Sequence, residues 1–192
     1  SAERAHAEFI LGTIELAVGE GETAVQLFLS ALAARMIEGE PKRIALGNLA
    51  LGTAYNSLQN YREAIYHTEK AIDLLDDLNV IVDLAVAKMN LGTIWLCQGN
   101  STKAREYYDQ AVPAFSLSRD KRHLAMIHSN MGYAYRLDKE WDASIAAYRR
   151  GIKLYEEIGD VDEHVNALEG LGATYADAEQ PKDAIEIFNT AL

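Results

Sequence analysis

The chain has 192 residues, a length that predicts one domain. Its residues are 49% hydrophobic and 24% charged, with only 3 prolines and 13 glycines, which is typical of a globular protein and excludes a disordered or collagen-like chain. The formal net charge of −11 repels a phosphate backbone, so we expect no direct contact with nucleic acid.

The sequence carries no sign of a membrane-spanning segment or a secretory signal. It has no run of about 18 apolar residues, and the first six residues lack the features of a signal peptide. Cys97 is the single cysteine, so it forms no internal disulfide and no cysteine-based metal site by itself. We therefore expect a cytoplasmic protein that does not contact a membrane.

An apolar residue followed by glycine recurs every 40 residues along the chain. The five copies are Leu11-Gly12, Leu51-Gly52, Leu91-Gly92, Met131-Gly132 and Leu171-Gly172. Three residues after the glycine, four copies have an aromatic residue: Tyr55, Trp95, Tyr135 and Tyr175. Twelve residues after it, all five have a small one: Ala24, Ala64, Ala104, Ser144 and Ala184. Such a fixed period predicts a repeat protein.

Each repeat is predicted to be a helix, a short turn and a second helix. Apolar residues recur with the helical period of about 3.6, and no alternating strand pattern competes. In chain order, turn-forming residues occur at 19–21, 59–60, 99–101, 138–140 and 179–181. Gly39, Asn79, Arg119 and Gly159 end the second helices, where a left-handed residue is favoured, and Arg119 is the exception. The predicted units are 1–39, 40–79, 80–119, 120–159 and 160–192.

These residues resemble the tetratricopeptide repeat, which has a Leu-Gly pair and an aromatic residue in its first helix and small and aromatic residues in its second. The unit of 40 residues is longer than the usual one of about 34 and resembles the variant of kinesin light chains and bacterial tetratricopeptide regulators. The resemblance implies an all-α, right-handed superhelical solenoid of five stacked helix-turn-helix units, forming a single array over residues 1–192.

No constellation of residues points to catalysis or to metal or cofactor binding. None of the five histidines has a second histidine four residues away, as a helical metal site needs. The segment Gly19-Glu20-Gly21 lacks the lysine of a phosphate-binding loop, and Cys97 has no histidine placed to activate it. We therefore expect no catalytic residue, no metal, no cofactor and no enzymatic activity.

The resemblance implies that the first helices line a concave groove that binds a peptide or a segment of a partner protein. Asn90 and Asn130 match an asparagine with which grooves of this family grip a peptide backbone. The apolar members are expected to form an exposed patch, with packing against the adjacent unit as the alternative. The expected groove residues are Leu46, Leu49, Thr53, Asn56, Val86, Met89, Asn90, Thr93, Met126, Ser129, Asn130, Tyr133 and Arg136.

Two other functional features remain open at this stage. The alternative to a protein-interaction module is an effector-sensing domain of a larger bacterial transcription or signalling protein. The lysine that would recur in a chaperone-binding carboxylate clamp is missing from the inward positions, so we reject that function. Residues 151–192 are strongly acidic and would either steer a basic partner or only keep the surface solvated.

The C-terminal helix is predicted to carry an apolar stripe. Ile185, Phe188 and Leu192 recur with helical spacing and would be covered by a further unit in a longer array. We expect possible self-association of the chain through this stripe.

Overall fold

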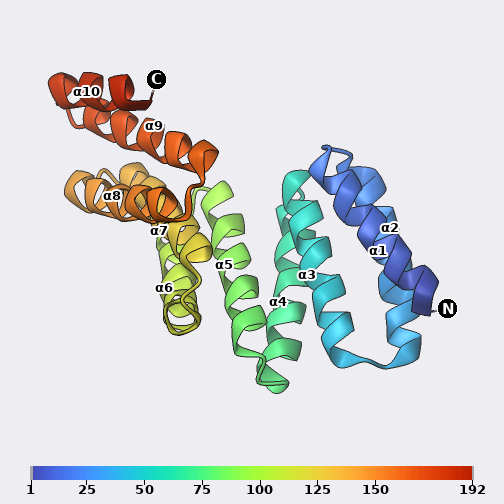
Figure 1. Ribbon diagram of the computed structural model, residues 1–192. Helices are drawn as coiled ribbons and strands as arrows, with labels where there is room; N and C mark the ends of the chain where they lie inside the picture. The colour runs from blue at the N-terminus through green and yellow to red at the C-terminus, as the bar shows by residue number, and fades with distance from the viewer. Residues whose placement is uncertain (1, 192) are drawn as a thin grey trace. The chain divides into compact units, whose positions relative to one another are not determined.

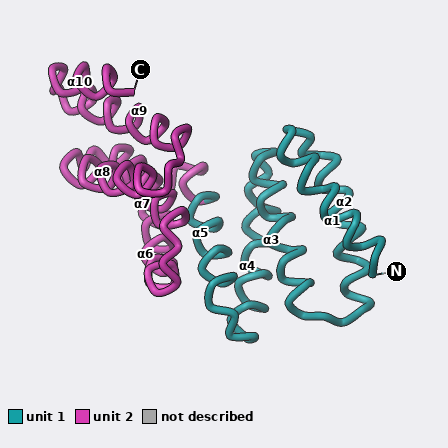
Figure 2. The backbone as a smooth tube through the Cα atoms, viewed as in Figure 1, with its two compact units in different colours: residues 1–94 teal, residues 95–192 magenta. Residues whose placement is uncertain are grey.

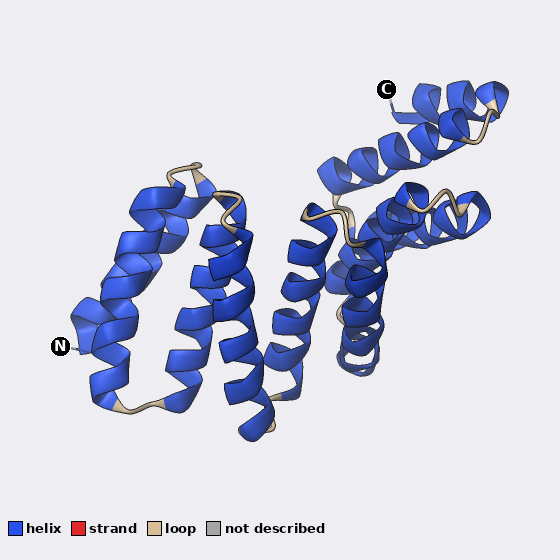
Figure 3. Cartoon of the chain, turned by 180° about the vertical axis from the view of Figure 1, so that it is seen from behind, coloured by secondary structure: helices blue, strands red, loops and turns tan. Residues whose placement is uncertain are grey.

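The computed structural model describes residues 2–191, which form ten α-helices joined by short loops and no strand (Figures 1 and 3). This confirms the all-α fold and the predicted order of helix pairs. The helices are α1 (Ala2–Ala17), α2 (Gly21–Glu38), α3 (Pro41–Ser57), α4 (Tyr61–Asp77), α5 (Ile81–Cys97), α6 (Ser101–Ser118), α7 (Lys121–Leu137), α8 (Trp141–Ile158), α9 (Val161–Asp177) and α10 (Pro181–Ala191).

The helices form two compact units, residues 1–94 and residues 95–192 (Figure 2). In the first unit α1 packs on α2, α2 on α3 and α3 on α4. In the second unit α6 packs on α7, α7 on α8, α8 on α9 and α9 on α10. Stacked helix pairs are thus the building block of both units, whereas the single array over residues 1–192 stays a prediction.

Each of the nine loops between the described helices contains one residue in the left-handed backbone conformation. These residues are spaced 20 apart, with φ between 53° and 90°. Our sequence analysis expected them only where second helices end and missed those at the turns within pairs. They are Gly19, Gly39, Gln59, Asn79, Gly99, Arg119, Lys139, Gly159 and Glu179.

Hydrogen bonds at the helix ends explain why residues other than glycine accept this conformation. The N–H of Gln59 donates to the carbonyl of Asn56, and the N–H of Asn60 donates to that of Tyr55, both at 2.9 Å. This pair of bonds satisfies two carbonyls that the helix end leaves free. Arg119, the expected exception, adopts φ 56° and closes α6 in the same way, so the bonding of the helix end outweighs the side-chain preference.

The two helices of a pair cross closely because a glycine of the first lies under an aromatic ring of the second. A Cβ atom added to Gly132 would lie 2.6 Å from the Tyr148 ring, and one added to Gly172 would lie 2.6 Å from the Phe188 ring. The small residues that follow the turns are buried beside these crossings, as the repeat pattern predicted: Ala24, Ala64, Ala104, Ser144 and Ala184. Burial raises the pKa of the Tyr148 phenol to about 12, so the ring stays neutral at the crossing.

We expect Arg119→Gly to stabilise the chain. A left-handed backbone costs a residue other than glycine about 1 kcal/mol, which this substitution relieves. The midpoint of thermal unfolding should therefore rise. The matched control is Gly159→Ala, at φ 72° in the corresponding loop of the next repeat, which should lower the midpoint. A lower midpoint for Arg119→Gly would contradict this account.

We expect Gly132→Ala to destabilise the chain although alanine favours helix. The added methyl group overlaps the Tyr148 ring, and overpacking of this kind costs about 1–3 kcal/mol, more than the gain of about 1 kcal/mol in helix propensity. Urea unfolding of both single variants and of the double variant with Tyr148→Leu checks the contact. If the cost of Gly132→Ala is the same in both backgrounds, the ring is not its cause.

Candidate functional site

The first helices of each unit lie next to one another. In the first unit α1 contacts α3, and in the second unit α7 contacts α9. Within either unit, no such contact joins neighbouring second helices in the part of the chain that is described. Each unit therefore curves toward its first helices, and their outward-facing side chains line the inner surface.

Two of the expected groove residues, Leu49 and Met89, are buried. Their exposed fractions are only 9% and 4%, so the expectation that they form an exposed patch is wrong. Leu49 belongs to a core cluster that includes Leu75 of α4 and Ala87 of α5. The physical reason is its place three residues before the close crossing, where the first helix turns this side toward its neighbours. The alternative, packing against the adjacent helices, is correct for Leu49.

The first helices nevertheless keep accessible side chains, which we call the first-helix face. In the first unit Thr53 is exposed and the other members are half-buried. The Asn90 amide of α5 donates to the Thr53 hydroxyl of α3 at 3.3 Å, which joins two neighbouring first helices. The Asn56 carbonyl oxygen is buried and has no hydrogen-bond partner in the described chain. The members in this unit are Leu46, Thr53, Asn56, Val86, Asn90 and Thr93.

In the second unit the first-helix face consists of Met126, Asn130, Tyr133 and Arg136. Met126 and Tyr133 are 36% and 38% exposed, and the half-buried Asn130 lies between them on the same side of α7. The Asn130 amide makes no hydrogen bond within residues 2–191. Arg136 pairs with Asp177 of α9 at 2.9 Å.

Ser129 does not belong to this face. It was expected among the groove residues, but it lies against Gly151 of α8 and is therefore turned toward the second helix of its own pair. The position three residues before the repeat glycine thus faces the interior in Ser129 as it does in Leu49.

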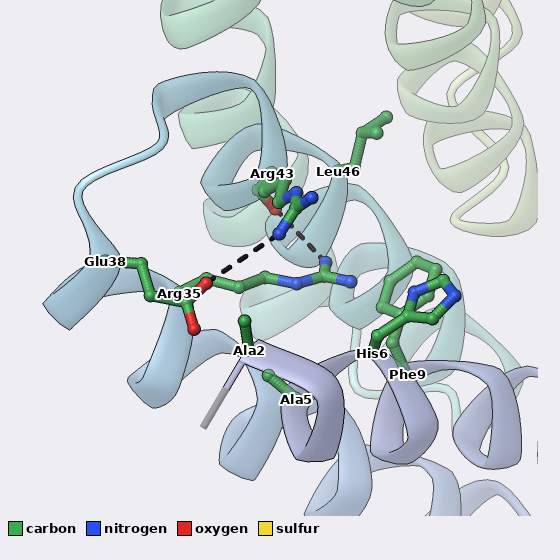
Figure 4. Close-up of a pocket in the computed structure, with 8 residues that line it drawn as sticks. All are labelled: Ala2, Ala5, His6, Phe9, Arg35, Glu38, Arg43 and Leu46. Carbon is green, nitrogen blue, oxygen red and sulfur yellow. Dashed lines mark hydrogen bonds and ion pairs between the residues drawn. The ribbon is translucent and has the colours of Figure 1, made fainter.

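The sequence analysis missed a pocket in the first unit, of about 250 Å³ (Figure 4). Its innermost charged residue, Arg35, is only 6% exposed. The corresponding residues one, two and three repeats later are Leu75, Phe115 and Tyr155, so the replacement of an apolar core residue by arginine was visible in the sequence. The pocket is lined by Ala2, Ala5, His6, Phe9, Arg35, Glu38, Arg43 and Leu46, of which only Leu46 was an expected groove residue.

Other expected features bear on metals, membranes and self-association. Across residues 2–191 no group of three His, Cys, Asp or Glu side chains is placed to hold a metal ion. None of the described helices has the length and apolar character that crossing a membrane requires. Ile185 is 61% exposed, whereas Phe188 packs on Gly172, and Leu192 lies outside the described residues. Self-association through this stripe stays a prediction.

The chain is a helix-pair repeat protein in which a small residue and an aromatic ring mark each crossing. The sequence model of the tetratricopeptide repeat matches residues 83–157 and 123–192, which together make up more than half of the chain. The chain belongs to the tetratricopeptide repeat family. No curated protein matches its sequence.

Solved structures with the same fold have low sequence identity to the chain. BtubC (BKLC) from P. vanneervenii is 18% identical with a TM-score of 0.84, covering 99% of this chain and 79% of that one. A Podosopora anserina protein described as a kinesin light chain with nearly identical TPR-like repeats is 14% identical with a TM-score of 0.79, covering 100% and 94%. RapI in its apo form is 15% identical with a TM-score of 0.79, covering 98% and 52%. At such identities the likeness shows the fold alone.

We expect Leu49→Glu to unfold the chain or to destabilise it severely. An unpaired carboxylate placed among Ala45, Leu75 and Ala87 loses its hydration and gains no partner, and such changes are among the most destabilising known. Far-UV circular dichroism and thermal unfolding check this. The matched control is Met126→Glu at an exposed position, which should leave the unfolding midpoint nearly unchanged. Equal behaviour of the two variants would mean that Leu49 is not a core residue.

Proposed function

We propose that the chain is a protein-interaction module that binds an extended segment of a partner polypeptide on its first-helix face. Tetratricopeptide repeats stack into arrays that present extended binding surfaces, and both units of this chain expose such a surface on their first helices. The proposal concerns binding without catalysis.

The observation that carries the proposal is the free amide of Asn130. A side-chain amide can donate and accept at once, which matches the N–H and carbonyl of an extended peptide. Asn130 spends neither capacity within the described chain, although it is half-buried, and a half-buried amide without a partner is poorly satisfied by solvent. Met126 and Tyr133 flank it with apolar surface that would cover the side chains of a bound segment.

The first unit supports the same function with a second polar group. The Asn90 amide uses one of its donors on the Thr53 hydroxyl, which fixes its orientation on the face. Its carbonyl oxygen remains available to a partner N–H. The two asparagines occupy the same position in consecutive repeats, 40 residues apart, so each unit offers one amide to a partner.

The alternative function, an effector-sensing domain of a larger regulator, draws support from the Rap proteins. A Rap protein whose solved structure is complexed with Competence and Sporulation Factor is 14% identical to the chain, with a TM-score of 0.78. The likeness covers 99% of this chain and 63% of the Rap protein. Binding on the first-helix face is common to both functions, so the same experiment addresses them.

We expect Asn130→Ala combined with Tyr133→Ala to weaken peptide binding at least tenfold while the unfolding midpoint stays unchanged. Loss of the two contacts removes a hydrogen-bonding amide and an aromatic anchor, and aromatic anchors commonly contribute about 2 kcal/mol or more to binding. Peptides selected from a randomised library by the wild-type chain serve as probes, and fluorescence anisotropy measures their affinity.

The matched control is Tyr66→Ala combined with Asn189→Ala. It makes the same two chemical changes at exposed positions of the second helices α4 and α10. Binding that this control weakens as strongly as the test variant, or that neither affects, would place the binding surface away from the first-helix face.

A further inference from the structure

We propose that the pocket around Arg35 receives the side-chain carboxylate of an acidic residue in the partner polypeptide. The inference rests on the proposed function and specifies the chemistry of the segment that the first unit recognises. It is carried by the burial of Arg35, by its lack of an ion-pair partner and by the place where the pocket opens.

Arg35 occupies a position that the other repeats reserve for the core. One, two and three repeats later the residues are Leu75, Phe115 and Tyr155, which are 0%, 0% and 2% exposed. An arginine in this position gives up packing and places a guanidinium where burial is costly. Residues that break the local rule of a fold in this way are expected at functional sites.

The chain accommodates Arg35 without neutralising it. Its guanidinium donates from Nη1 to the backbone carbonyl of Arg43 at 3.2 Å and lies 4.1 Å from the centre of the Phe9 ring. Within residues 2–191 no carboxylate lies at ion-pair distance from it. The two nearby glutamates are engaged by Arg43 instead, Glu40 at 2.8 Å and Glu38 at 3.8 Å. One buried positive charge is left over.

Glycine makes room for this arrangement. A Cβ atom at Gly47 would lie 3.1 Å from Leu32 Cδ1 and 3.5 Å from Arg35 Nη1, while the corresponding residue of the next repeat is Ala87. Burial, together with the charge of Arg43, lowers the pKa of Arg35, but a guanidinium remains protonated at neutral pH. The charge is therefore present and calls for an anion.

The pocket opens on the inner side of the first unit. Figure 4 shows the Arg35 side chain running along the pocket, with its guanidinium end toward the rings of His6 and Phe9. His6 is exposed at the rim, and Leu46 belongs to the first-helix face. A peptide lying on that face can therefore send a side chain into the pocket.

The walls determine which anion fits. Apart from its charged groups the pocket is lined by Ala2, Ala5, Phe9 and Leu46, which suit the methylene groups of a glutamate side chain. A single uncommitted guanidinium matches one carboxylate, which it can bind through two parallel hydrogen bonds. The net charge of −11 opposes an acidic partner only at long range, because salt at 0.15 M screens exposed charges beyond about 8 Å.

The test uses a randomised library of N-acetylated, C-terminally amidated peptides, in which side chains carry the only carboxylates. Peptides selected by the wild-type chain should be enriched in glutamate or aspartate at one position. Their affinity should fall at least tenfold with Arg35→Leu, and equally with the Glu→Gln change in the peptide. Combining both changes should cause no further loss, since each removes the same contact.

Arg35→Leu restores the residue type of Leu75, so its unfolding midpoint should equal or exceed that of the wild type. Arg35→Met serves as the second variant should the leucine variant fail to fold. The matched control is Arg150→Leu, which removes one exposed arginine from α8 and should leave affinity unchanged.

Three results would overturn the proposal. Selected peptides that bind Arg35→Leu as well as the wild type would show that the pocket is not used, while the proposed function would stand. Binding only to peptides with a free C-terminal carboxylate would assign the pocket to a chain end instead of a side chain. A wild-type chain that selects no peptide from either kind of library would overturn the proposed function and this inference together.

Discussion

The close crossing of the two helices in each pair is the constraint on which the rest of the structure depends. Where Gly132 and Gly172 lie under Tyr148 and Phe188, no side chain separates the backbones from the rings. At Gly52 the ring is replaced by Thr68, whose hydroxyl turns back to the Ala64 carbonyl at 2.8 Å. The crossing fixes which side of a first helix turns inward. It thereby decides which residues remain for a partner.

The loops obey an equally strict rule. A left-handed residue stands every 20 residues, whether or not it is glycine, because the helix end must satisfy its free carbonyls within a very short connection. Lys139 and Glu179 accept this conformation as Gly19 and Gly99 do. Two helix ends per repeat therefore share one backbone solution, and this keeps the period of 40 free of insertions.

The fold could be predicted from the sequence because its determinants are local and repeated five times. Helical periodicity, small residues at the crossings and turn residues all agree, so the helix pairs were found. The binding surface was predicted less well. The family pattern locates the inward side of a first helix but does not tell whether a given side chain reaches solvent or a neighbouring helix. Leu49 and Met126 look alike in sequence, and only the packing of α4 and α5 around Leu49 separates them.

The exceptions to the repeat are more informative about function than the repeat itself. Packing demands the same residue type in every copy, so a column that changes type in one copy must be answering a different demand. Arg35 replaces a buried apolar residue and keeps a charge that its own neighbours leave unpaired. Asn130 retains an amide that nothing in its own unit uses, while Asn90, one repeat earlier, holds the Thr53 hydroxyl. In both cases the missing partner is polar and directional, which is the kind of contact that gives a repeat surface its specificity.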